Sequence, residues 1–126
     1  MPMRPAESFD ISVHLADILE KEAAGVFTPA GRVLSWTSAS PQRTPEGQER
    51  IIPLAKALAD VAQTAGLPAV ERVWVDGVQR KILLLRTPKL GLFLVLIGAA
   101  TMNIGLAWLK MKQASSAADE AFKDEK

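Results

Sequence analysis

Cysteine and tyrosine are absent from this sequence of 126 residues, and histidine occurs only once, as His14. The absence of cysteine excludes disulfides and thiolate metal ligands, and no constellation of metal-binding residues is recognisable. A catalytic histidine needs a positioned nucleophile or acid, and neither is marked out beside His14. We therefore expect a protein that is not an enzyme, with no metal and no cofactor. An enzyme that uses His14 is an alternative for which the sequence suggests no substrate.

The sequence also lacks a large excess of either charge, since 15 basic and 14 acidic residues give a net charge of +1. No basic run is present, so we expect no nucleic-acid partner. Residues 1–8 contain two prolines and an acid but no apolar segment, which excludes a secretory signal and predicts a disordered N-terminal tail. Residues 98–105 lack the lysine of a phosphate-binding loop and the spacing of a dinucleotide fingerprint. These features favour a cytoplasmic protein.

Residues 90–109 form a run of 20 residues without a charge, flanked by lysines. A helix of about 20 apolar residues spans a bilayer, so one interpretation is a membrane-anchored adaptor. The run contains three glycines, however, and residues 98–103 have the chemistry of a turn, with Thr101 as a candidate N-cap. The preferred interpretation is a buried strand over 92–97 followed by a helix, with no membrane contact.

Helix and hairpin patterns alternate in the first half of the chain. Ser8 or Asp10 can cap a first helix that ends near residues 23–25. The apolar face of that helix is predicted to comprise Ile11, Leu15, Ile18 and Leu19. A hairpin with short strands at 26–28 and 32–36 follows, and residues 37–46 are predicted to form a surface loop.

The second helix has the clearest periodicity in the chain. Its apolar stripe comprises Ile51, Leu54, Ala55, Leu58, Val61, Ala62 and Ala65. Gly66 is well placed to end it, whereas Pro53 predicts either a start near Ile51 or a bend. Its other side, which includes Lys56, Asp60 and Thr64, is typical of a solvated face.

Three strands follow, at 70–75, 80–86 and 91–97. Asp76 and Gly77 suit a reversed hairpin turn, and the short connections favour an antiparallel meander. A final helix begins after Asn103, and residues 115–126 are predicted to be a solvated helical extension or tail. Helices covering an antiparallel sheet define an α+β fold.

The strand at 70–75 is predicted to lie at a sheet edge and contains Val73, Trp74 and Val75. An exposed apolar edge favours pairing with a second copy in a two-fold dimer. We expect Val73→Asp to split such a dimer without unfolding the monomer.

This order of elements resembles the roadblock (dynein light chain, LAMTOR-like) family over about residues 11–114. The resemblance lies in Gly31, in Gly66 and Leu67, in Asp76 and Gly77, and in the run from Asn103 through Gly105 to Leu106. It implies an α-β-β-α-β-β-β-α domain over 9–114. It also implies a five-stranded antiparallel sheet, with the long helix on one face and the first and last helices on the other. The short first strand and Pro53 are departures from the family pattern.

The resemblance further implies a homodimer that regulates or scaffolds a Ras-like small GTPase, as a GTPase-activating or localising partner. The implied dimer interface comprises Val70, Arg72, Val73, Trp74 and Val75 on the edge strand and Leu58 and Val61 on the long helix. By the same analogy, Arg50 and Lys56 are candidates for contacting the GTPase.

Overall fold

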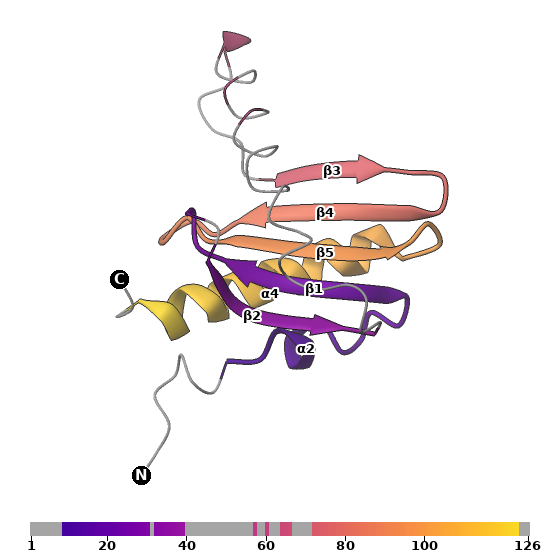
Figure 1. The fold of residues 1–126 in the computed structure, drawn as a ribbon, viewed down its shortest axis with the longest axis horizontal. Coiled ribbons are helices and arrows are strands. Elements are labelled where there is room, and N and C mark those ends of the chain that lie inside the picture. The colour runs from indigo at the N-terminus through magenta and orange to yellow at the C-terminus, as the bar shows by residue number, and fades with distance from the viewer. Residues whose placement is uncertain are drawn as a thin grey trace.

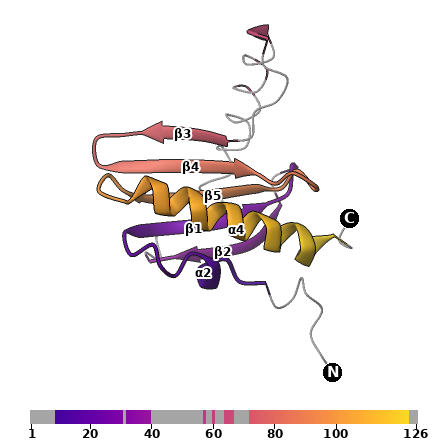
Figure 2. The same ribbon diagram turned by 180° about the vertical axis from the view of Figure 1, so that it is seen from behind.

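The computed structural model describes residues 9–30, 32–39, 57, 60, 64–66 and 72–123. A five-stranded antiparallel sheet forms the centre, in the order β2-β1-β5-β4-β3 (Figure 1). The elements, in chain order, are helix α2 (Ile11–His14), strands β1 (Lys21–Phe27), β2 (Val33–Ser38), β3 (Arg72–Asp76), β4 (Arg80–Arg86) and β5 (Phe93–Ala99), and helix α4 (Ile104–Phe122). Both helices lie on the same face of the sheet (Figure 2). The α+β fold, the five strands and the shared face of the first and last helices are confirmed.

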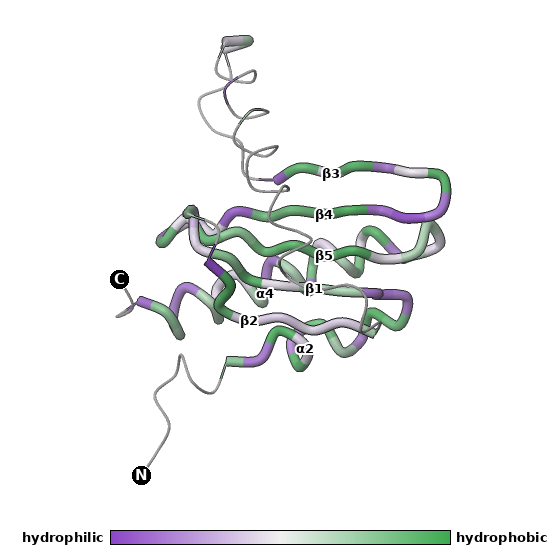
Figure 3. Tube along the Cα trace, viewed as in Figure 1, coloured by the Kyte–Doolittle hydropathy of each residue, from purple (hydrophilic) through white to green (hydrophobic). Residues whose placement is uncertain are grey.

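Strand β5 occupies the centre of the sheet because both of its faces are apolar. Leu94 and Leu96 are buried beneath the two helices, whereas Phe93, Val95 and Ile97 are buried on the opposite face. The uninterrupted apolar colouring of this strand is visible in Figure 3. Strands β3, β4 and β5 are joined in sequence by antiparallel pairing, which confirms the predicted meander.

The charge-free run of residues 90–109 is divided between β5 and the first turns of α4. Asn103 is the N-cap of α4, and its side-chain oxygen accepts a hydrogen bond of 3.0 Å from the Leu106 amide. The expectation that Thr101 caps this helix is therefore wrong, because the cap lies further along the chain. Within the described residues, no helix is long and apolar enough to cross a membrane, so the spanning interpretation of 90–109 is also wrong.

The first helix is shorter than predicted. Helix α2 ends at His14, and β1 begins at Lys21 and is a full strand of seven residues. Residues 23–25, expected near the end of the helix, therefore lie within the sheet, where Gly25 pairs with Trp36. A side chain at position 25 would meet the Trp36 ring at 2.6 Å, so only glycine fits beneath this indole. Small residues here mark close packing in the sheet and not the end of a helix.

Three of the four residues assigned to the face of the first helix are buried in the core under α4. Ile11, Leu15 and Ile18 are each 1% exposed, whereas Leu19 is 86% exposed. The period of 3.6 fails at Leu19 because the chain has already left the helix. Strand β2 also continues to Ser38, so the loop predicted from residue 37 begins later than expected.

The hairpin between β3 and β4 is present, but its turn differs from the prediction. Residues 77–79 separate the strands, and the Gly77 amide donates a 2.9 Å hydrogen bond to the Arg80 carbonyl. A reversed two-residue turn requires positive φ angles, and in the described part of the chain only Gly66 and Gly91 have them. The φ of +94° at Gly66 is compatible with the predicted end of the long helix, which otherwise lies outside the described residues.

Helix α4 continues to Phe122, so the extension predicted from residue 115 is helical through residue 122, but part of it is buried and not solvated. Ala118, Asp119 and Phe122 are all at most 4% exposed. Phe122 packs edge-on against Phe9, with ring centroids 5.4 Å apart. The last turns of α4 thus pack against the residues at the start of the domain and close the core there.

Asp119 fastens α4 to the turn between β4 and β5. Its two carboxylate oxygens accept hydrogen bonds from the amides of Lys89 and Leu90, at 2.9 and 3.1 Å. The same turn is held internally by Thr87, whose hydroxyl accepts from the Leu92 amide at 3.0 Å. A carboxylate accepting backbone N–H groups in a partly buried place forms charge-assisted hydrogen bonds, which are stronger than neutral ones.

We expect Asp119→Ala to lower the free energy of unfolding by about 2–3 kcal/mol, because two amides lose a charged acceptor. Urea unfolding followed by circular dichroism measures the change. The matched control is Glu120→Ala, the neighbouring carboxylate, which pairs with Lys123 at the surface and should leave the free energy of unfolding almost unchanged. Equal losses in the two variants would contradict a clamping role for Asp119.

Candidate functional site

Strand β3 lies at one edge of the sheet and pairs with β4 alone among the described strands (Figure 1). An edge strand presents unpaired backbone donors and acceptors along its free side. Its middle residues are Val73, Trp74 and Val75, and its ends are charged, with Arg72 at one end and Asp76 at the other. The free edge of β3 is therefore a short apolar stretch between two opposite charges.

The side chains of β3 alternate between the two faces of the sheet. Val73 is half-buried and packs against the cluster that contains Leu84 and Ile82. Trp74 is 50% and Val75 41% exposed, although both are large and apolar. Two adjacent exposed apolar residues on the free edge of a strand are typical of a surface for association.

Cations hold the aromatic side chains on the helix-covered face of this edge. The Arg72 guanidinium lies 5.2 Å from the centre of the Trp108 ring of α4, and the Lys81 ammonium 5.5 Å from that of Trp74. Lys81 also forms an ion pair of 3.3 Å with Asp76 across the two strands. These contacts link β3 to β4 and α4, so the edge is presented in a defined position.

The opposite edge of the sheet, β2, is partly protected. The amide of Ile11, at the start of α2, donates a 3.1 Å hydrogen bond to the Ser35 hydroxyl of β2. A register shift at Val26 and Phe27 also interrupts the pairing of β1 with β2. Bulges and covering helices are common protections against pairing with another chain. The two edges therefore differ, and β3 is the one left open within the described part of the chain.

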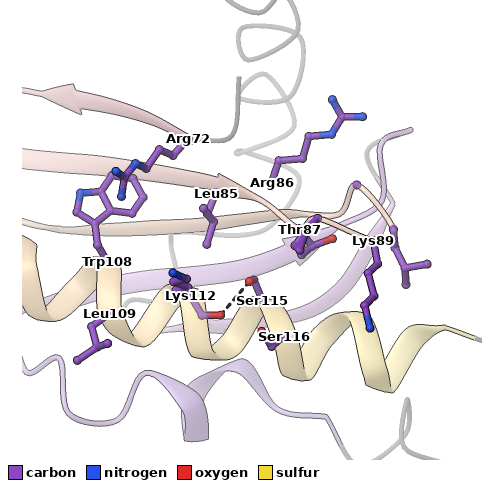
Figure 4. Close-up of a pocket in the computed structure, with 13 residues that line it drawn as sticks. Arg72, Leu85, Arg86, Thr87, Lys89, Trp108, Leu109, Lys112, Ser115 and Ser116 are labelled. Atoms are coloured by element: carbon purple, nitrogen blue, oxygen red, sulfur yellow. Dashed lines mark hydrogen bonds between the residues drawn. The ribbon is translucent and has the colours of Figure 1, made fainter. Parts of the chain in front are cut away.

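A cavity of about 820 Å³ adjoins this edge, between α4 and the ends of β3 and β4 (Figure 4). Its wall includes Arg72, Leu85 and Lys89 from the sheet side and Trp108 and Lys112 from α4. Arg72 extends across the Trp108 ring in Figure 4. The described lining contains no aspartate or glutamate, so the cavity is basic as well as partly apolar.

Arg86 also lines the cavity but does not direct its charge into it. Its guanidinium lies 5.9 Å from the ring centre of Phe93, which is buried on the sheet face opposite α4. Figure 4 shows this side chain pointing away from α4. The charges available to the cavity are therefore those of Arg72, Lys89 and Lys112.

The structure brings together only some of the residues that the sequence nominated. Arg72, Val73, Trp74 and Val75 share the edge strand, as expected. The remaining interface and GTPase-contact candidates, Val70, Leu58, Val61, Arg50 and Lys56, lie outside the described residues. Three residues in the range of the predicted long helix are described as helical, and all three are exposed: Ala57, Asp60 and Thr64.

His14 has no catalytic arrangement around it in the described structure. Its ring stacks on Phe9, with centroids 4.9 Å apart. The described residues contain no group of three or more histidine, aspartate or glutamate side chains that could hold a metal ion.

Sequence comparison gives no identification, since no protein-family model and no curated protein matches this chain. Solved structures do match. MglB from Myxococcus xanthus superposes with a TM-score of 0.80 at 16% identity, over 98% of this chain and 94% of that one. The gliding protein MglB from Thermus thermophilus gives 0.79 at 19% identity, covering 98% and 95% of the two chains.

A Roadblock/LC7 domain from Streptomyces avermitilis also superposes, with a TM-score of 0.68 at 15% identity over 86% of this chain and 91% of that one. The class of protein is thereby defined at the level of fold: the chain forms a roadblock-like domain. Among the individual structures, it is similar to MglB over almost its full length. The resemblance found in the order of elements is confirmed.

Sequence analysis missed the cavity and the role of Asp119. Arg72 and Lys112 are 40 positions apart, and no periodic pattern relates a strand residue to a helix residue across that separation. Asp119 stands beside Glu120 in a polar stretch, where a solvated pair was expected. Only the helical spacing of Ala107, Met111, Ala114 and Ala118 indicated that the helix continues as a buried element.

Proposed function

We propose that this protein is a homodimeric regulator or scaffold of a Ras-like small GTPase. The observation that carries the proposal is the roadblock-like fold with an unprotected apolar edge at β3. The resemblance in sequence order implies dimers and GTPase partners for this fold. Regulation here means binding the GTPase so as to accelerate GTP hydrolysis or to localise the GTPase. The side chains of this protein would carry out no chemistry themselves.

Dimerisation through β3 would extend the five-stranded sheet across a two-fold axis. Pairing would satisfy the free backbone groups of β3 and would cover Trp74 and Val75, which are half-exposed in the single chain. A structure of MglB with a tetrameric arrangement, at 19% identity and a TM-score of 0.78, is a fold relative that assembles further. Leu58 and Val61 of the long helix would complete the interface.

Val73→Asp, the substitution suggested by the sequence alone, is a poor test of this interface. Val73 is half-buried in the cluster around Leu84, so a carboxylate there would also destabilise the monomer. Val75 is more exposed and is the better position.

We expect Val75→Asp to convert the dimer into a folded monomer, because two carboxylates would be brought together at the paired edge. Light scattering after gel filtration should give twice the chain mass of 13.6 kDa for the unmodified protein and one chain mass for the variant. Val78→Asp is the matched control, since Val78 is 97% exposed in the turn beyond the strand and should leave the dimer intact. A variant that stays dimeric would move the interface away from β3.

We expect the dimer to bind a Ras-like GTPase of the same organism, with affinity that depends on whether the GTPase carries GDP or a GTP analogue. Arg50→Glu and Lys56→Glu should each weaken binding by about tenfold, roughly 1.4 kcal/mol, if these cations meet the GTPase. Lys123→Glu, at the end of α4, is the charge-reversal control and should bind normally. Calorimetric titration measures these affinities.

The two halves of the proposal fail separately. An intact dimer that binds no Ras-like GTPase in either nucleotide state would overturn the GTPase half. Normal GTPase binding by both charge-reversal variants would instead retain the partner and exclude Arg50 and Lys56 from the contact.

A further inference from the structure

A cavity lies between α4 and the β3–β4 edge, and the proposed GTPase regulation and dimerisation make no use of it. Its charged side chains, Arg72, Lys89 and Lys112, come from a strand, a turn and a helix. The fold therefore gathers three cations around a single space of about 820 Å³. Small-molecule sites are commonly of this size, at roughly 300–1,000 Å³.

Within the described residues, no carboxylate forms an ion pair with Arg72 or Lys112, whereas several other cations are paired. Elsewhere on the described surface, Lys110 pairs with Asp17 at 2.9 Å and Arg80 with Glu22 at 2.7 Å. Arg72 and Lys112 form no ion pair with any described residue. An anion entering the cavity would thus meet cations without first displacing a carboxylate.

Two described carboxylates of α4, Asp119 and Glu120, interact with other groups. Asp119 is buried and accepts the amides of Lys89 and Leu90. Glu120 accepts a hydrogen bond from Lys123, which lowers the pKa of Glu120, and Lys89 adds a smaller attraction. Neither carboxylate is placed as a partner for Arg72 or Lys112.

Arg72 is held in place before any ligand arrives. Its guanidinium stacks on the Trp108 ring, and Lys112 follows Trp108 by one helical turn on the same side of α4. A stacked guanidinium keeps its N–H groups free at its rim and loses less conformational entropy on binding than a mobile side chain. Leu85 and Trp108 add an apolar wall beside these donors.

We propose that this cavity binds a small molecule that carries a phosphate group. An arginine fork and lysine ammonium groups are the side chains that bind phosphate oxygens most effectively. The volume exceeds that of a bare phosphate ion, and the apolar wall suits the organic portion of a phosphate ester. The same chemistry is offered by a soluble phosphate ester and by the headgroup of an anionic lipid.

The test is a titration of the isotope-labelled full chain with inorganic pyrophosphate at constant ionic strength, followed by NMR. The indole N–H signal of Trp108 is assigned by its absence from the spectrum of Trp108→Phe. This signal should shift with pyrophosphate concentration until it reaches a plateau, whereas the indole signal of Trp36 on β2 should stay fixed. Lys112→Gln and Arg72→Gln should each raise the Kd at least about tenfold, the loss expected for one charge-assisted contact. Lys110→Gln removes the same charge from the same helix outside the cavity and should leave the Kd unchanged.

A second arm separates the two sources of phosphate. Co-sedimentation with vesicles of phosphatidylcholine and phosphatidylglycerol in equal parts, reduced by Lys112→Gln but not by Lys110→Gln, would assign a lipid headgroup. Pyrophosphate binding without vesicle binding would assign a soluble ester. The absence of both responses, or equal effects of the two lysine variants, would overturn the proposal. A Trp108 shift caused by a polyglutamate peptide but not by pyrophosphate would also overturn the proposal. Neither arm depends on a GTPase, so the result is independent of the proposed function.

Discussion

The burial of β5 on both faces is the constraint from which the rest of this structure follows. A strand with apolar side chains on both sides must lie in the interior of a sheet and be covered above and below. Leu94 and Leu96 are covered by α2 and α4, and Val95 and Ile97 are buried on the opposite face. Strand β4, its neighbour in the meander, pairs with β5 on one side, and β1 pairs with it on the other. Strands β2 and β3, hairpin partners of these neighbours, then become the edges.

The two edges have opposite characters, and the functional surface follows from this difference. At β2 the start of α2 bonds to Ser35, and a register shift disturbs the pairing with β1. At β3 the exposed residues are Trp74 and Val75 together with the charged Arg72 and Asp76 at its ends, and the cations Arg72 and Lys81 lie over aromatic rings on the α4 side. A protein that stays monomeric normally protects such an edge with charge, proline or a bulge. The difference favours association at β3.

Helix α4 connects this edge to the remainder of the molecule. Its inward side closes the core through Met111 and Phe122, and its β4-facing side carries Trp108, Lys112 and Asp119. Asp119 holds the turn whose residues form one wall of the basic cavity, so the shape of the cavity depends on two hydrogen bonds between a helix and a turn. Arg72 belongs both to the edge strand and to the cavity wall. The proposed association at the edge and the proposed occupancy of the cavity therefore share a residue.

The sequence by itself determined the class of fold, the five strands, the meander and the division of the apolar run into a strand and a helix, because alternation and turn chemistry are local properties. It did not determine where the first helix ends, since small residues at 23–25 suit either a helix end or a strand that admits the Trp36 ring. The edge residues could be predicted because their apolar character lies within one short strand. Asp119 and the cavity were decided by tertiary structure, because a carboxylate in a polar stretch acquires a structural role only when a distant turn presents two amides to it. Cations 40 positions apart become one site only when a helix crosses a sheet at that point.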